Sequence, residues 1–149
     1  MKSYRVSWMA TLALASSRVL AQSPSPDAVV EIKTAVATVL VDQVILSTTW
    51  LPGCQPPMCI TAKAPERFLS VWLRPKDNAA VGNMNKETEK AYVVTPEGVK
   101  AKRWNFGFSV DREGHTTDIL VFKVRSTGRI FTLSWPGGAD YKLTVTSEK

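Results

Sequence analysis

The chain has 149 residues, of which 44% are hydrophobic, 21% charged and 9% aromatic. This composition excludes a disordered, collagen-like or low-complexity chain, because enough apolar side chains are present to form a core. A length near 150 residues fits one domain. The formal net charge is +6, with 19 basic and 13 acidic residues.

Residues 1–21 have the pattern of a secretory signal peptide. Lys2 and Arg5 precede an apolar run at residues 6–15, and Val19 and Ala21 stand at the −3 and −1 positions that signal peptidase accepts. A helix over this run would be about 15 Å long, too short to span a bilayer. We therefore predict cleavage before Gln22 and a secreted or periplasmic location, with an uncleaved anchor as the alternative and no membrane span after cleavage.

Removal of the predicted signal changes the charge balance. It takes away Lys2, Arg5 and Arg18 and no acid, which leaves 16 of the 19 basic residues against 13 acidic ones, a net charge of +3. A charge this small over the remaining chain gives no reason to expect a nucleic-acid partner.

The mature chain begins with a Ser/Pro-rich segment, residues 22–28, which we interpret as a flexible leader. Residues 29–46 are rich in Val, Ile, Leu and Thr and contain neither Gly nor Pro. Because β-branched residues favour extended chain, we predict a strand near 29–36 and another near 39–46, or one long bent strand.

The rest of the chain alternates between short apolar runs and turn signals. No stretch has a helical period, and residues 76–90 are interpreted as a polar connection. The sequence therefore predicts an all-β fold, an antiparallel β-sandwich of seven to nine short strands spanning residues 29–149. Beyond residue 46, strands are expected at 68–73, 92–95, 99–103 with an extended continuation over 104–110, 118–125, 129–135 and 141–146, with turns at 96–98, 111–114, 126–128 and 136–138.

Alternation within these runs identifies the buried face of each strand. In residues 118–125, Leu120, Phe122 and Val124 share one side, which we predict to face the core, while the other side faces water. Trp72 and Trp135 also lie in strands and are predicted core residues.

The order of four segments, FLSVWLRPKDN, AYVVTPEGVK, TDILVFKV and IFTLSWPGG, resembles the telokin-like, immunoglobulin-like domains of secreted bacterial proteins of unknown function. The resemblance covers about residues 67–145. It implies an immunoglobulin-like sandwich with an extracytoplasmic binding or accessory role. It supplies no catalytic residues to carry over.

Two cysteines lie in the long proline-rich connection at residues 48–65. Cys54 and Cys59 are separated by Gln-Pro-Pro-Met. In an exported protein, such a pair predicts a local disulfide that stiffens the loop. A redox or metal role is the alternative, but a thioredoxin-like pair needs C-x-x-C at the start of a helix, and a metal site needs more ligands than one His supplies.

The same connection is the predicted binding surface. A long loop made rigid before it meets a partner loses little freedom on binding. The side chains expected to make the apolar contact are Trp50, Leu51, Met58 and Ile60. In the alternative interpretation, the loop caps the open end of the sandwich and buries these same side chains.

A second aromatic site is possible where Lys100, Lys102 and Arg103 precede Trp104. Positive charge beside an aromatic ring can stack on sugars or hold anionic polymers. A solvated strand face is the alternative.

His115, the single histidine, lies in a polar segment with Asp111, Glu113 and Asp118. A carboxylate could orient it as a general base, but Asp, Gly and Thr are also ordinary turn residues. No nucleophile elbow or phosphate loop accompanies it. We therefore predict a non-enzymatic binding or accessory module for an envelope or extracellular protein or glycan, without cofactor or metal. The alternative is a small cell-envelope enzyme that uses His115 and the acidic residues of segment 111–118.

Overall fold

A computed structural model describes residues 29–35, 37–50, 58–77 and 84–149. The predicted signal peptide and leader lie outside these residues. The described elements, in chain order, are β1 (Glu31–Lys33), β2 (Thr38–Ser47), β3 (Thr49–Trp50), β4 (Ile60–Thr61), β5 (Arg67–Pro75), α1 (Met84–Glu87), β6 (Tyr92–Val94), β7 (Lys100–Val110), β8 (Thr116–Val124), β9 (Ile130–Ser134), β10 (Asp140–Thr144) and β11 (Ser147–Glu148).

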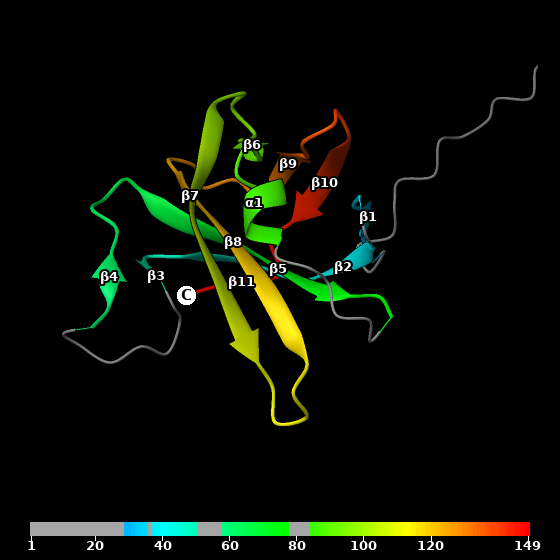
Figure 1. Ribbon diagram of the computed structural model, residues 1–149. Helices are drawn as coiled ribbons and strands as arrows, with labels where there is room; N and C mark the ends of the chain where they lie inside the picture. Colours follow the sequence, from blue (N-terminus) through cyan, green and yellow to red (C-terminus); the bar gives the residue numbers. More distant parts are fainter. Residues whose placement is uncertain (1–28, 36, 51–57, 78–83) are drawn as a thin grey trace, which may run out of the picture.

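The strands form one continuous path in the order β1-β2-β5-β8-β7-β6-β9-β10 (Figure 1). Neighbours on this path are antiparallel, and β11 adds to β2 in parallel. The path folds into two layers, with β1, β2, β5 and β8 in the first layer and β6, β9 and β10 in the second. A separate two-stranded ribbon, β3–β4, lies beside the first layer. The all-β prediction is confirmed.

Strand β7 connects the two layers. Its first residues, 100–102, pair with β6, whereas the residues from Arg103 onward pair with β8. The register shifts between Arg103 and Asn105, which marks a β-bulge at Trp104. A bulge bends a strand and increases its twist, so this irregularity lets one strand serve both layers.

The main core lies between the two layers. The inner face of the first layer is built by alternate residues of β5 and β8, and each of these side chains is at most 1% exposed: Leu69, Val71, Leu73, Leu120, Phe122 and Val124. Val93, Leu133 and Leu143 meet them from the second layer. The predicted face of β8 and the buried position of Trp135 are confirmed.

The other face of β8 is not the wet face that we expected. Ile119 and Val121 are buried, and they pack with Trp50 and Phe68 in a second, smaller cluster. That prediction is wrong because the sequence of one strand says nothing of what covers its second face. Trp72 also lies on this side and is only partly buried.

The helix α1 falls in the segment that we interpreted as a polar connection. It is one turn long and is held by tertiary contacts rather than by a repeating apolar pattern. Met84 is buried in the core, the Thr88 hydroxyl donates to the Met84 carbonyl (2.7 Å), and Arg103 donates to the Asn85 carbonyl (2.8 Å). Among the described residues, no helix is long or apolar enough to cross a membrane.

Candidate binding surface around Trp104

The outer face of the first layer faces away from the main core, and it carries the smaller apolar cluster. Strand β5 contributes Phe68, Ser70 and Trp72 to it, and β8 contributes Ile119 and Val121, since directly paired residues share a face. Ser70 Oγ and Trp72 Nε1 are buried here, and neither forms a hydrogen bond with any residue that the structure describes. The sequence pattern did not predict this second apolar cluster.

Trp50 of β3 covers part of this face. Its side chain is 8% exposed. It lies so close to β7 that a Cβ built at Gly107 would be 3.0 Å from the end of the indole ring. A side chain at this point of β7 would press on the indole, and glycine avoids that contact.

Trp104 lies at the margin of the cluster and is 36% exposed. Its ring meets the Trp50 ring edge to face, with centroids 6.3 Å apart, and lies 5.1 Å from the Phe68 ring. The Lys123 ammonium is 4.5 Å from the centroid of the Trp104 ring. Aromatic pairs and cation–π contacts of this kind fix a ring in place, so the exposed part of Trp104 is presented in one orientation.

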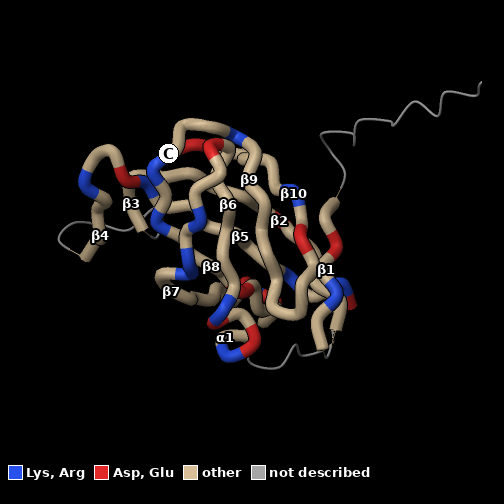
Figure 2. Tube along the Cα trace, turned by 90° about the horizontal axis from the view of Figure 1, so that it is seen from above, with Lys and Arg blue, Asp and Glu red and all other residues tan. Residues whose placement is uncertain are grey.

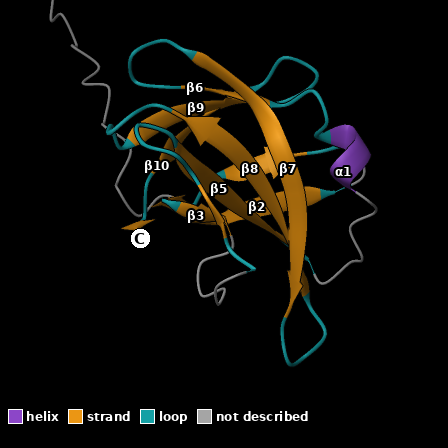
Figure 3. Cartoon of the chain, turned by 90° about the vertical axis from the view of Figure 1, so that its left-hand side faces the viewer, coloured by secondary structure: helices purple, strands orange, loops and turns teal. Residues whose placement is uncertain are grey.

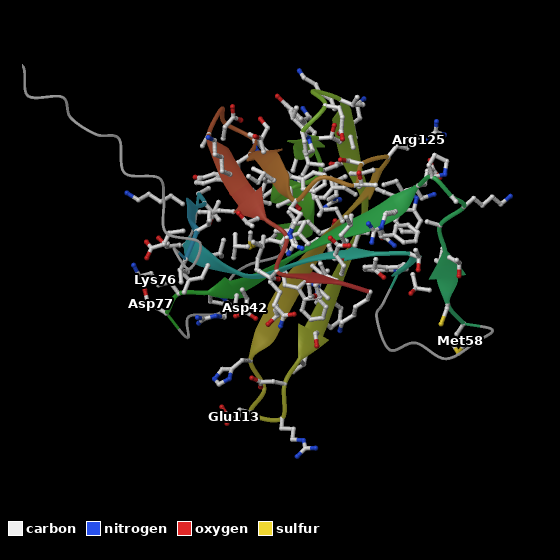
Figure 4. The ribbon with its side chains drawn as sticks, turned by 180° about the vertical axis from the view of Figure 1, so that it is seen from behind. Asp42, Met58, Lys76, Asp77, Glu113 and Arg125 are labelled. Atoms are coloured by element: carbon white, nitrogen blue, oxygen red, sulfur yellow. The ribbon has the colours of Figure 1, made fainter. Side chains whose placement is uncertain are left out.

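Ile60 lies next to Trp50 in the β3–β4 ribbon. It pairs directly with Trp50 across the β3–β4 ribbon, so the two side chains lie on the same face of that ribbon. Unlike Trp50, Ile60 is exposed. We call Ile60, Trp104 and Lys123 the Trp104 surface. Met58, which precedes β4, is 84% exposed and lies at the periphery of the molecule (Figure 4).

The residues of the predicted loop surface differ in burial, and each interpretation of the loop fits some of them. Trp50 is buried, as in the capping alternative, whereas Met58 and Ile60 are exposed, as in the binding interpretation. Leu51 and Cys54 lie outside the described residues, so the Cys54–Cys59 disulfide stays a prediction.

The basic residues before Trp104 do not form a single surface. Arg103 points inward, where it donates to Thr88 Oγ1 (2.7 Å), and burial lowers the pKa of its guanidinium. The Lys100 ammonium lies 4.9 Å from the Tyr92 ring centroid. Lys102 and Lys123 remain exposed, and Lys123 is the one whose ammonium lies over the Trp104 ring. In Figure 2 the blue Lys and Arg segments are spread over the region between the β3 and β6 labels rather than gathered at one point.

The enzyme alternative depends on the tip of the β7–β8 hairpin. Asp111, Glu113 and His115 come together there, with ligand atoms within 4.8 Å of one another, and all three are exposed. Figure 4 shows Glu113 at the far end of this hairpin. Asp118 is not part of the group: it lies on β8 opposite Phe108, and burial raises its pKa.

The carboxylate of Asp111 is committed to building the turn. One oxygen accepts the backbone N–H groups of Glu113 and His115, both at 2.9 Å, and the other contacts His115 Nδ1 at 3.0 Å. The N–H of His115 is the largest cause of the lowered pKa of Asp111. This is the geometry of a side chain that mimics a turn, and it explains the local sequence without catalysis.

No protein-family model, curated protein or solved structure matches this chain. The resemblance to telokin-like domains therefore stays a prediction.

Proposed function

We propose that the chain is an exported, non-enzymatic binding module of the immunoglobulin-like type, and that the Trp104 surface contacts a partner protein. The observation that carries the proposal is the partly exposed ring of Trp104, fixed by Trp50 and Phe68 and flanked by the Lys123 ammonium. Tryptophan is among the residues that contribute most to protein interfaces.

The surroundings of Trp104 favour a protein partner with an acidic rim. Ile60 and Met58 add exposed apolar area, which suits a protein surface, and Lys123 and Lys102 add positive charge at the margin. A fixed ring loses little freedom on binding, so its contacts convert into affinity with little entropic cost. Charge at the rim acts mainly on the association rate and on the choice of partner.

The geometry of the hairpin tip supports the non-enzymatic part of the proposal. The group of His115, Asp111 and Glu113 is exposed on a projecting turn. Both oxygens of the Asp111 carboxylate are already used by the turn. General acid–base catalysis needs a group that reaches a bound substrate, and a projecting tip offers little to hold one.

The test is a comparison of variants in a pull-down from the envelope and culture fluid of the source cells. Ile60→Ser and Lys123→Glu change the Trp104 surface without removing a buried side chain, and Trp104→Ala removes its centre. We expect Trp104→Ala to weaken capture of the bound protein at least about thirtyfold, as for an interface hot spot. Val99→Ser, at an exposed apolar residue in the β6–β7 turn, is the matched control.

A thermal melt accompanies each variant, because Trp104 also packs on Phe68 and Trp50. If Ile60→Ser and Lys123→Glu bind as well as the unchanged protein, the Trp104 surface is not the binding site. Export is tested separately by intact-mass measurement on secreted material. We expect a chain that begins at Gln22, and a mass that retains residues 1–21 contradicts cleavage.

A further inference from the structure

The second half of β7 has a free edge. Beyond the three residues that pair with β6, the Arg103 N–H donates to the Ala91 carbonyl (3.0 Å), and from there β7 is paired only with β8. Within the described part of the chain, no other strand pairs with residues 104–110. Figures 1 and 3 both show the end of the β7–β8 hairpin extending past the other described elements, so the part of the edge next to the turn is free of them.

The backbone groups on this edge can be assigned from the hairpin turn. The Asp111 N–H donates to the His115 carbonyl (3.0 Å), so Asp111 faces β8. The backbone N–H and C=O groups of successive residues in an antiparallel strand point to opposite edges. The backbone groups of Phe106, Phe108 and Val110 therefore point to the free edge. Consistent with this, the Phe106 N–H bonds to the side chain of Asn105 (2.8 Å) rather than to β8. Phe108 and Val110 keep donors and acceptors for an added strand.

The side chains of this edge leave it unprotected. Residues 104–110, WNFGFSV, contain no charged residue and no proline, the usual devices that prevent strand addition. Phe108 is 68% exposed, and Val110 is exposed as well. An accessible, uncharged and apolar edge is a template for pairing with another extended segment.

We propose that the segment which pairs with this edge is β7 of a second copy of the chain, in an antiparallel arrangement. The charges at the two ends of the edge support a self-complementary pair. Lys100 and Lys102 precede the uncharged run and are exposed, whereas Arg103 points inward. The exposed Asp111 and Glu113 follow the run, with Arg112 between them. Antiparallel pairing brings the basic end of each copy toward the acidic residues of the other, twice over by two-fold symmetry.

Pairing centred on Phe108 best satisfies the backbone hydrogen-bonding groups of the free edge. It places the two Phe108 residues opposite each other and Phe106 of each copy opposite Val110 of the other, so backbone groups that face outward meet. The Asn105 side chain gives up the Phe106 N–H when the strand is added. Opposed aromatic residues contribute a favourable cross-strand contact. The contact does not involve the partner proposed for the Trp104 surface.

Sedimentation equilibrium over a range of concentrations measures the pairing directly. We expect the unchanged protein to show a reversible monomer–dimer equilibrium. Phe108→Lys should weaken dimerisation at least about tenfold, because it places two like charges in contact at the centre of the pair. Val99→Lys, at a similarly exposed apolar residue outside the edge, is the matched control and should leave the equilibrium unchanged.

A cysteine tests the register. Phe108→Cys should form a covalent dimer under mild oxidation, because opposed residues of an antiparallel pair lie within disulfide distance, and Val99→Cys should not. A protein that stays monomeric at the highest soluble concentration, or a dimer that Phe108→Lys leaves intact, overturns the proposal. Lys123→Glu should not change dimerisation, so failure here is distinguishable from failure of the proposed partner binding.

Discussion

The two faces of the first layer are both apolar, but they are covered in different ways. The inner face, with Leu120 and Phe122, is closed by the second layer and is nearly inaccessible to solvent. The outer face is covered in part by Trp50 and leaves Trp104 at its margin partly exposed. It also holds two buried polar atoms, Ser70 Oγ and Trp72 Nε1, that have no hydrogen-bond partner within the described part of the chain. The inner face therefore stabilises the fold, whereas the outer face tolerates imperfect packing and presents a surface.

The largest loss of stability should come from a substitution on the inner face. Phe122→Ala removes a fully buried ring from the main core, which should lower the free energy of unfolding by roughly 3–5 kcal/mol. Chemical denaturation measures it. A loss below about 1 kcal/mol would mean that the site collapses or that the face is wrongly assigned.

A substitution that displaces Trp50 from the outer face should cause a smaller loss of stability. Gly107→Val places a branched side chain where the Trp50 ring now lies, within 3.0 Å of the added Cβ. Overpacking of this kind costs roughly 1–3 kcal/mol, and near-ultraviolet circular dichroism should report the displaced indole. Ser109→Val, two residues along β7 and exposed, is the control and should leave the signal unchanged.

Two buried serines on the outer face should behave in opposite ways. Ser47 Oγ donates to the Thr49 carbonyl (2.8 Å) and accepts the Thr49 N–H (3.0 Å), whereas Ser70 Oγ has no partner among the residues described. Ser47→Ala should cost about 1–2 kcal/mol, and Ser70→Ala should be neutral or stabilising by up to about 1 kcal/mol, because it removes an unsatisfied group. Thermal melts of both variants decide the matter; equal losses would contradict the assigned hydrogen bonds.

The smallest effect concerns Asp118, at the end of the inner face. Burial raises its pKa, so the folded state binds its proton more tightly than the unfolded state does. The sign follows from linkage: this contribution favours the folded state at low pH and is lost as the pH rises through the raised pKa. Asp118→Asn should change stability at neutral pH by only about 0.5 kcal/mol, in the stabilising direction.

The pH dependence provides the sharper measurement. Relative to Asp118→Asn, the unchanged protein should gain stability as the pH falls toward the raised pKa of this carboxyl group. Asp111, whose pKa is lowered by the turn, acts in the opposite sense and loses its contribution at still lower pH. Parallel pH profiles for the unchanged protein and Asp118→Asn would show that burial does not perturb Asp118.

The sequence by itself determined the local features. Alternation in β8 identified Leu120, Phe122 and Val124 as one buried face, because successive side chains of a strand point to opposite sides. The turns at 96–98 and 136–138 were predicted from Pro and Gly, and Gly98 and Gly138 do adopt positive φ angles of 82° and 95°. These features depend on neighbouring residues only, so a single sequence carries them.

Only the tertiary structure decided what each face meets. Trp50 was expected at a binding surface and lies instead over Gly107, while Trp104 comes to the margin of the same cluster through a bulge. The single turn of α1 depends on the buried Met84 and on Arg103, eighteen residues from its carbonyl acceptor on Asn85. The free edge of β7 arises because β6 is only three residues long. Such contacts join segments distant in sequence, and no local pattern encodes them.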